Sequence, residues 1–213
     1  MKRIDKQEAP SGFERCVKNK KKKKRPINWE SFSDSHPQVK QELADQLRRE
    51  QGYLCCYCEQ RIDEGNSHIE HLRPKGQYPE FTFQYANLLS CCCDKNSCGN
   101  KKGGWFSNDM VTPLTVNCEE RFIYLANGEI KPADTNDSHA QETIDQLNLN
   151  SKKLERLRMG VFDLWLYEKE DAVNNNNSIE DFAELVREVG LSLNSNGEYA
   201  EFWTTIKYVA EKA

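Results

Sequence analysis

The 213-residue sequence contains no long apolar run. A helix that crosses a bilayer needs about 20 consecutive apolar residues, and no segment approaches that length. The opening MKRIDKQEAP is charged and has no apolar stretch behind it, which is unlike a secretory signal. These absences argue against a membrane or secreted protein, and we expect a cytoplasmic one.

Apolar residues are also scarce overall, at 37% of the chain, whereas 30% of residues are charged. The net charge of −4 is uneven, because residues 1–30 hold 11 Lys and Arg against 4 Asp and Glu. The run KNKKKKKR (18–25), which includes Lys22, carries like charges that repel one another. We therefore predict a basic arm over 1–37 that is disordered or extended when free. Such an arm suits the phosphates of nucleic acid. It would equally suit an acidic partner or a solvated terminus.

Nine cysteines are present, and seven of them fall in two short clusters. Such clusters in a cytosolic chain indicate metal ligation rather than disulfides. The pair Cys55-x2-Cys58 is typical of a zinc-binding turn. Cys98 supplies one member of a second pair, and the spacing leaves three candidates for the other: Cys91, Cys92 and Cys93. Cysteines outside the site are expected to be buried free thiols.

The expected zinc site has four sulfur ligands and no open position, so we predict a structural rather than a catalytic metal. The surrounding segment, about 53–112, has few apolar side chains and little periodic pattern. A segment of this kind cannot be held together by burial alone. Metal binding would then contribute directly to its folding free energy.

Periodic patterns flank the cysteine-rich segment. Val39, Leu43 and Leu47 recur at helical spacing, which predicts a helix over 38–54 that ends near Gly52. Further on, ERFIYLANGEIKPA predicts a β-hairpin with a type I′ turn at Asn127-Gly128.

Helical patterns dominate the rest of the chain, at 143–172, 179–189 and in the closing YAEFWTTIKYVAEKA, with a polar linker at 174–177. The apolar face of the first of these comprises Leu154, Leu157, Val161, Leu164 and Trp165. We therefore predict an α+β fold with three regions. These are a basic arm (1–37), a helix with a small zinc-stapled core (38–112), and a hairpin with helices (113–213).

Within the cysteine-rich segment the order Glu-His-x-x-Pro, then Asn-Leu, then Cys-x-Asn-x-Lys resembles the HNH (ββα-metal) endonuclease motif over 55–102. The resemblance implies a β-hairpin and a helix that grip one divalent ion. It implies that His71 is the general base and that Glu70 and Asn100 are the metal ligands. Asn87 would hydrogen-bond across the loop and hold that base in place.

The usual spacing from Asn87 in this family favours Cys92 as the fourth zinc ligand. In the commonest HNH pattern the last His or Asn directly follows the final cysteine. Here Gly99 stands at that place, and Asn100 comes one residue later.

The chemistry of these residue types agrees with the implied roles. An imidazole ionises near neutral pH and can deprotonate an attacking water. The oxygens of Glu70 and Asn100 suit Mg²⁺ or Mn²⁺ better than zinc. Because neighbouring strand residues point to opposite faces, Glu70 and His71 need a local bend to converge. His68, two residues before Glu70, is either a further contact or a structural histidine, and we favour the latter.

Four basic residues near the motif are suited to bind phosphates of the substrate or simply to form a solvated face: Arg73, Lys75, Lys101 and Lys102. Whether that substrate is DNA or RNA stays open. The alternative to a nuclease is a non-catalytic zinc module that binds nucleic acid or a partner. The co-presence of Glu70, His71, Asn87 and Asn100 favours the nuclease, since a binding module needs only the cysteines and basic or aromatic residues.

Longer segments carry a more specific resemblance. IEHLRPKGQYPEFTFQYANLLSC, CGNKKG, IYLANGEI and TIDQLNLN resemble the PtuB-type nucleases of Septu and related retron anti-phage systems. The resemblance implies a partner, an ATPase of the PtuA type that holds and controls the nuclease. Region 113–213 is the candidate surface for that partner.

Overall fold

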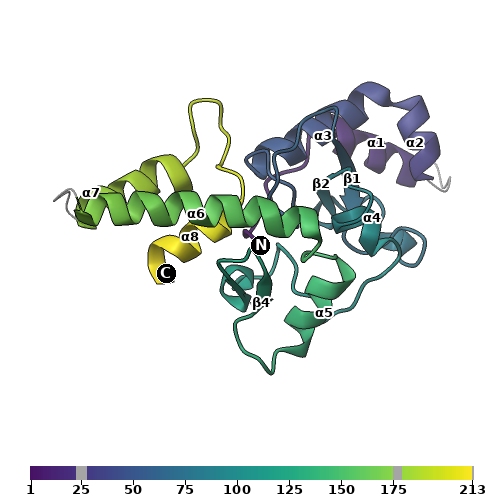
Figure 1. Cartoon of the computed structure of the whole chain (residues 1–213). Helices are drawn as coiled ribbons and strands as arrows, with labels where there is room; N and C mark the ends of the chain where they lie inside the picture. The colour runs from purple at the N-terminus through teal and green to yellow at the C-terminus, as the bar shows by residue number, and fades with distance from the viewer. Residues whose placement is uncertain (23–27, 175–178, 213) are drawn as a thin grey trace.

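The computed structural model describes residues 1–22, 28–174 and 179–212. In these residues the chain forms eight α-helices and two antiparallel sheets of two strands each, so the α+β prediction is confirmed. Figure 1 shows the long helix α6 (Lys152–Asn174) in the middle of the molecule, with α1 to α4 and the β1–β2 hairpin toward one end. Helices α7 and α8 lie toward the other end. No helix in the described ranges is both long and apolar enough to span a membrane.

The N-terminal segment is folded wherever the structure describes it, which corrects the expectation of an extended or disordered arm. Met1 and Ile4 are buried in the central core. Residues Ser11–Lys22 form α1, and Trp29–Ser35 form α2. These apolar positions interrupt the charged sequence, and Phe13 packs with the residues of α2 in a second core. The rest of the basic run, 23–25, lies outside the described residues, so its contact with phosphates stays a prediction, as do the region boundaries.

Glu59 ties the N-terminus to the other end of the chain. Its carboxylate lies 3.1 Å from the buried ammonium of Met1 and accepts hydrogen bonds from the backbone N–H and the hydroxyl of Thr204, at 2.8 and 2.6 Å. Burial alone would raise the pKa of Glu59, but the ammonium and the Thr204 hydrogen bonds outweigh it, and the pKa is lowered. A charged Glu59 therefore fastens three distant segments together.

We expect Glu59→Ala to lower the free energy of unfolding by about 3–5 kcal/mol, because it leaves the ammonium buried without a counter-charge. Urea denaturation measures this loss. Glu8→Ala, at an exposed position, is the control and should change the midpoint little. Equal midpoints for the two variants would show that the Glu59 contacts do not stabilise the fold.

The predicted helix over 38–54 is α3, Pro37–Glu50. Pro37 starts it at a position where a missing N–H costs nothing, and the chain leaves it through Gly52 at φ +58°. Leu43 and Leu47 are fully buried against the β1–β2 hairpin and the first two helices. The prediction of an amphipathic helix here is confirmed, with an end a few residues earlier.

The hairpin under α3 carries the candidate site. Strand β1 (Ser67–His71) pairs antiparallel with β2 (Leu88–Cys92), so that His71 lies opposite Leu88 and Ser67 opposite Cys92. The loop between them holds two short 3-10 turns, Pro79–Phe81 and Tyr85–Asn87. The short helix α4, Cys98–Lys102, follows β2 and packs against it. Strand, strand and helix thus succeed one another in the order that a ββα unit requires.

The second hairpin joins β3 (Phe122–Tyr124) to β4 (Ile130–Pro132), as predicted, but its turn is not of type I′. A type I′ turn needs two residues at positive φ, whereas only Gly128 is left-handed here, at φ +80°. The turn is instead a three-residue loop closed by a Leu125 N–H to Glu129 O hydrogen bond of 2.9 Å. Helix α6 sets this shape, because Arg158 donates to the Gly128 carbonyl at 2.7 Å.

The helical stretch predicted over 143–172 is two helices, α5 (Ser138–Gln146) and α6. Asn148 breaks it by adopting φ +48°, a conformation that Asn tolerates better than most residues. Leu147 and Leu149, on either side, are buried in the central core. Periodicity alone missed this break because Leu147, seven residues before Leu154, continues the apolar spacing across it.

The C-terminal helices pack into a core of their own. Helix α7 (Ile179–Leu185) runs into a π-helical segment, Val186–Leu191, and α8 (Trp203–Lys212) packs along α6. The predicted apolar face of α6 is only partly buried. Leu154 and Trp165 lie inside, but Leu157 and Leu164 are 40% and 55% exposed. Part of the apolar face of α6 is therefore exposed at the protein surface.

Candidate metal centre and active site

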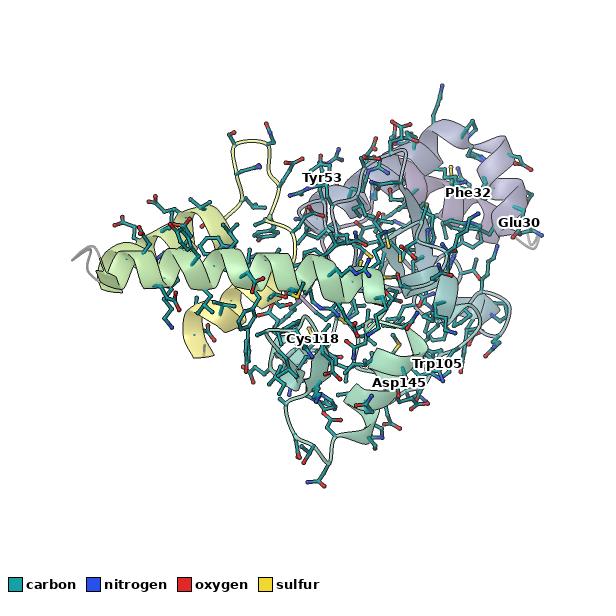
Figure 2. The ribbon with its side chains drawn as sticks, viewed as in Figure 1. Glu30, Phe32, Tyr53, Trp105, Cys118 and Asp145 are labelled. Carbon is teal, nitrogen blue, oxygen red and sulfur yellow. The ribbon has the colours of Figure 1, made fainter. Side chains whose placement is uncertain are left out.

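Four cysteine side chains converge at the base of the β1–β2 hairpin. The sulfurs of Cys55, Cys58, Cys92 and Cys98 lie within 4.8 Å of one another, and all four residues are buried. Four thiolates bound to one zinc at about 2.3 Å would lie at comparable separations. Figure 2 shows sulfur atoms, in yellow, gathered among side chains between the hairpin and α6. The group can hold one metal ion, and it is the set that the sequence analysis assigned.

Strand alternation separates Cys92 from the two other candidates. Neighbouring residues of β2 point to opposite faces, and it is the sulfur of Cys92 that joins the group of four. Cys93 is exposed, and its sulfur lies 3.8 Å from Nδ1 of His68. Cys91 is buried with Cys55 and Cys56 in a second group of three thiols. Cys56 and Cys91 thus fit the expectation of buried thiols that pack beside the metal centre.

His71 closes β1 and is 8% exposed. Its Nε2 lies 3.2 Å from the backbone oxygen of Thr82. A carbonyl only accepts hydrogen bonds, so we infer that Nε2 carries the proton and that Nδ1 keeps its lone pair. The edge-on ring of Trp29, at 4.5 Å between centroids, packs beside it. Burial lowers the pKa of His71 to about 4, which leaves the imidazole neutral at pH 7.

Asn87 ties together the base of the loop that carries Thr82. Its Oδ1 accepts a hydrogen bond from the Arg73 N–H at 2.8 Å. Its Nδ2 donates to the carbonyls of Arg73 and Phe81, at 3.1 and 3.2 Å. Three hydrogen bonds from one buried amide span the loop between β1 and β2. The Thr82 carbonyl that orients His71 lies on this loop.

Glu70 is buried at 7% exposure beside two cationic or potentially cationic groups. Its Oε1 lies 2.8 Å from Nζ of Lys102, and its Oε2 lies 3.6 Å from Nε2 of His68. Burial raises the pKa of Glu70, but the hydrogen bond from His68 and the charge of Lys102 outweigh it and lower the pKa. In turn, the hydrogen bond to Glu70 raises the pKa of His68. Glu70 is therefore a carboxylate.

Glu70 and His71 contact different neighbours. Glu70 lies against α4 and His68, whereas His71 lies against α2 and Thr82. Strand β1 runs straight through both residues without the expected bend, and alternation sends their side chains to opposite faces. Lys102 links them, because its ammonium also donates to the His71 carbonyl at 3.2 Å.

The structure does not bring Asn100 against Glu70. Asn100 is exposed, and its amide donates to the Asp94 carbonyl at 3.0 Å. The residue of α4 that faces Glu70 is Gly99, where an added Cβ would lie 2.6 Å from Oε2. Neighbouring helix residues are about 100° apart around the axis, so 99 and 100 cannot face the same group. Of the two metal ligands implied by the resemblance, Glu70 and Asn100, only Glu70 is buried at this site.

The predicted basic rim is also incomplete. Lys102 is buried in the ion pair with Glu70, so it cannot be a rim residue. Lys75 pairs with Glu30 of α2. Arg73 stacks over the rings of Phe81 and Phe106, at 4.2 and 5.2 Å. Lys101 is exposed. Nothing in the sequence signalled that Lys102, unlike Lys101, would turn inward.

A groove of about 460 Å³ runs beside β1, between that strand and helices α2 and α3. Its lining includes Trp29, Lys40, Arg48, Ser67 and His68. Arg48 is already paired with Asp45, and it also donates to the Ser67 hydroxyl at 3.2 Å. Besides Arg48, the charged side chains of the lining are Lys40, which can meet a phosphate, and the exposed Glu64, which would repel one. No sequence pattern indicates this groove, because its walls come from three separate elements.

Two curated proteins are similar to the chain, which no protein-family model matches. The protein named "Retron Vc95 putative HNH endonuclease", from Vibrio cholerae serotype O1 biovar El Tor, is 30% identical over 140 residues, covering 61% of this chain and 67% of that protein. "Septu protein PtuB" from Bacillus thuringiensis is 30% identical over 146 residues, covering 67% of this chain but only 51% of its own length.

Fold and thiol group together define an α+β protein with a candidate metal centre on its first hairpin. With these relatives, the chain belongs to the HNH-type nucleases of anti-phage systems. The resemblance noted in the sequence is confirmed at the level of the family.

Proposed function

We propose that the protein is a metal-dependent HNH endonuclease that hydrolyses phosphodiester bonds, and that it is the nuclease subunit of an anti-phage defence complex. The observation that carries this proposal is the state of His71. The ring is neutral, one nitrogen donates to Thr82, and the other keeps a lone pair. A neutral imidazole held in this orientation can act as a general base.

In the proposed reaction His71 Nδ1 takes a proton from the water that attacks phosphorus. One P–O ester bond breaks, and the leaving sugar oxygen takes up a proton from solvent. The Nε2–H bond to Thr82 fixes the ring orientation, and Asn87 holds the loop on which Thr82 lies. A divalent cation at Glu70 would supply Lewis-acid stabilisation of the charge that develops on phosphate. Because Glu70 and His71 point to opposite faces of β1, this step requires the strand to bend when substrate binds. Glu70 offers a buried, ionised carboxylate for that cation, whereas Asn100 does not face it.

The zinc is proposed as the frame of this site rather than as its catalyst. Cys55 and Cys58 precede β1, Cys92 ends β2, and Cys98 starts α4. One ion on these four sulfurs would fasten the turn before β1 to the end of β2 and to the start of α4. Strand β1, which carries Glu70 and His71, pairs with β2. Four thiolates leave no position for water or substrate.

The groove beside β1 is proposed as the path of the nucleic-acid strand. It runs past His68 and Trp29, next to the face of the hairpin that carries His71. Lys40 supplies a cation for a backbone phosphate, and Trp29 supplies an aromatic wall.

We expect Lys40→Ala to weaken nucleic-acid binding and to reduce the slope of log K against log salt by about 1, the effect of losing one phosphate contact. Titration by fluorescence anisotropy at several salt concentrations gives the slope. Lys131→Ala, at a half-exposed lysine on β4, is the control and should keep the wild-type slope. Identical slopes for both variants would place the strand elsewhere.

A partner ATPase of the PtuA type is proposed on the strength of the resemblance and of the similar Septu protein. A nuclease acting alone would endanger its own cell, so we expect the isolated chain to cleave weakly. Exposed apolar side chains in region 113–213 offer a contact surface: Leu157, Leu164, Tyr167, Val189 and Leu193.

The test of the proposed function is cleavage of circular DNA and circular RNA by the zinc-loaded chain, alone and with its ATPase, in Mg²⁺ or Mn²⁺. Linearised circles that form only with added divalent ion identify a metal-dependent endonuclease. Binding of both substrates without cleavage under every condition would instead support the alternative, a non-catalytic zinc module.

A further inference from the structure

Glu70 lacks the second ligand that a bound cation would require from the protein. Position 99 has no side chain, and Asn100 is held to the Asp94 carbonyl. We propose that His68 supplies the missing ligand, so that Glu70 and His68 together hold the catalytic divalent cation. This inference rests on the proposed function and departs from the ligand pair that the family resemblance implies.

The strand geometry brings the two side chains together. His68 and Glu70 are two residues apart on β1, so they project from the same face. Nε2 of His68 lies 3.6 Å from Oε2 of Glu70. One ion with two bonds of about 2.1 Å can bridge a nitrogen and an oxygen at that separation.

The second nitrogen of His68 also has a partner. Nδ1 lies 3.8 Å from the sulfur of Cys93. Without an ion, the Nε2 proton faces the Glu70 carboxylate. A bound cation would displace that proton, and the proton on Nδ1 can then point to the Cys93 sulfur. Metal-binding histidines are commonly oriented in this way through the nitrogen that does not bind the ion.

Access and space also favour this position. The His68 side chain is 33% exposed and lines the groove beside β1, so an ion and a phosphate can reach it. Lys102 holds Oε1 of Glu70, which leaves Oε2 as the oxygen that faces His68. Gly99 keeps a side chain away from that oxygen. The Lys102 ammonium offsets part of the negative charge, so we expect a modest affinity.

The donor set predicts which ion is preferred. Mg²⁺ binds mainly oxygen ligands, whereas imidazole nitrogen suits later transition metals and is accepted by Mn²⁺. A pair of one carboxylate and one imidazole should therefore bind Mn²⁺ more tightly than Mg²⁺. This preference is a property of His68 and disappears when that residue is replaced.

The test is a Mn²⁺ titration of the zinc-loaded full chain, with free Mn²⁺ followed by electron paramagnetic resonance. We expect His68→Ala to weaken binding at least as much as loss of an outer-shell partner does, roughly 10- to 100-fold. His139→Ala, at a 51% exposed histidine of α5, is the matched control and should bind as the wild type does. Zinc content and circular dichroism verify that each variant is folded. If His68→Ala does not fold, His68→Gln takes its place.

Three outcomes overturn the inference: Mn²⁺ affinity unchanged in the His68 variants, affinity lost in Asn100→Ala instead, or no Mn²⁺ binding by the wild type. The readout is separate from cleavage. If the protein cleaves nucleic acid but its Mn²⁺ affinity is the same with and without His68, the proposed function stands and His68 is not a ligand. If Mn²⁺ binds through His68 but the protein never cleaves nucleic acid, His68 is a ligand and the proposed function is wrong.

Discussion

His71→Ala is expected to slow phosphodiester cleavage by about 10²- to 10⁴-fold, the usual contribution of a positioned general base. The variant removes the nitrogen that would accept the proton of the attacking water. It leaves the four-thiol group, Glu70 and Lys102 unchanged. The loss should therefore fall on the chemical step, under conditions where all the substrate is bound.

Single-turnover cleavage by the complex with its ATPase measures this step. Each preparation needs its zinc content and melting temperature, because His71 is buried against Trp29 and its removal opens a small space. His139→Ala again serves as the control for a histidine outside the site. A His71 variant that is folded, loaded with zinc and fully active would remove the general base from this account.

Loss of the zinc is expected to have the largest effect on the fold. Structural zinc contributes about 10–16 kcal/mol of apparent binding free energy in zinc-finger peptides, as much as a whole domain's stability of about 5–15 kcal/mol. Cys58→Ser should therefore lose the ion and unfold the hairpin that carries Glu70 and His71. The C-terminal core around α6 and α8 has its own set of buried residues, so we expect it to lose less protection than the hairpin, even though Thr204 of α8 is bonded to Glu59 beside Cys58.

Zinc analysis and hydrogen exchange resolved by segment test this expectation. Cys16→Ser is the matched control, because Cys16 lies on α1 outside both thiol groups. The control should retain one zinc and slow exchange in β1 and β2. If Cys58→Ser also retained one zinc and a protected hairpin, the four-thiol group would not be the metal centre.

Local sequence patterns predicted the parts of the fold that local rules determine. Helix α3 follows from Leu43 and Leu47 at helical spacing, and the existence of the second hairpin follows from alternation around Gly128. The four thiols could be proposed because cysteines are rare and their spacing is distinctive. For Cys92 the family spacing decided, and the structure places its sulfur within the group of four.

The errors came from contacts between distant segments. The N-terminal segment folds because Met1 meets Glu59 and Thr204, which no periodicity reveals. The turn at Gly128 takes its shape from Arg158 of α6. In the candidate site, Lys102 turns inward because buried Glu70 needs a counter-charge, and Gly99 takes the place expected for a ligand.

Activation of water for attack on a phosphodiester can be tested by tracing the oxygen atom of that water into the product. The complex would cleave DNA and RNA in ¹⁸O-labelled water under single-turnover conditions, with the new ends analysed by mass spectrometry. The account predicts one heavy oxygen in each newly formed terminal phosphate. Unlabelled cyclic phosphate ends, which form when a ribose hydroxyl attacks instead of water, would contradict it.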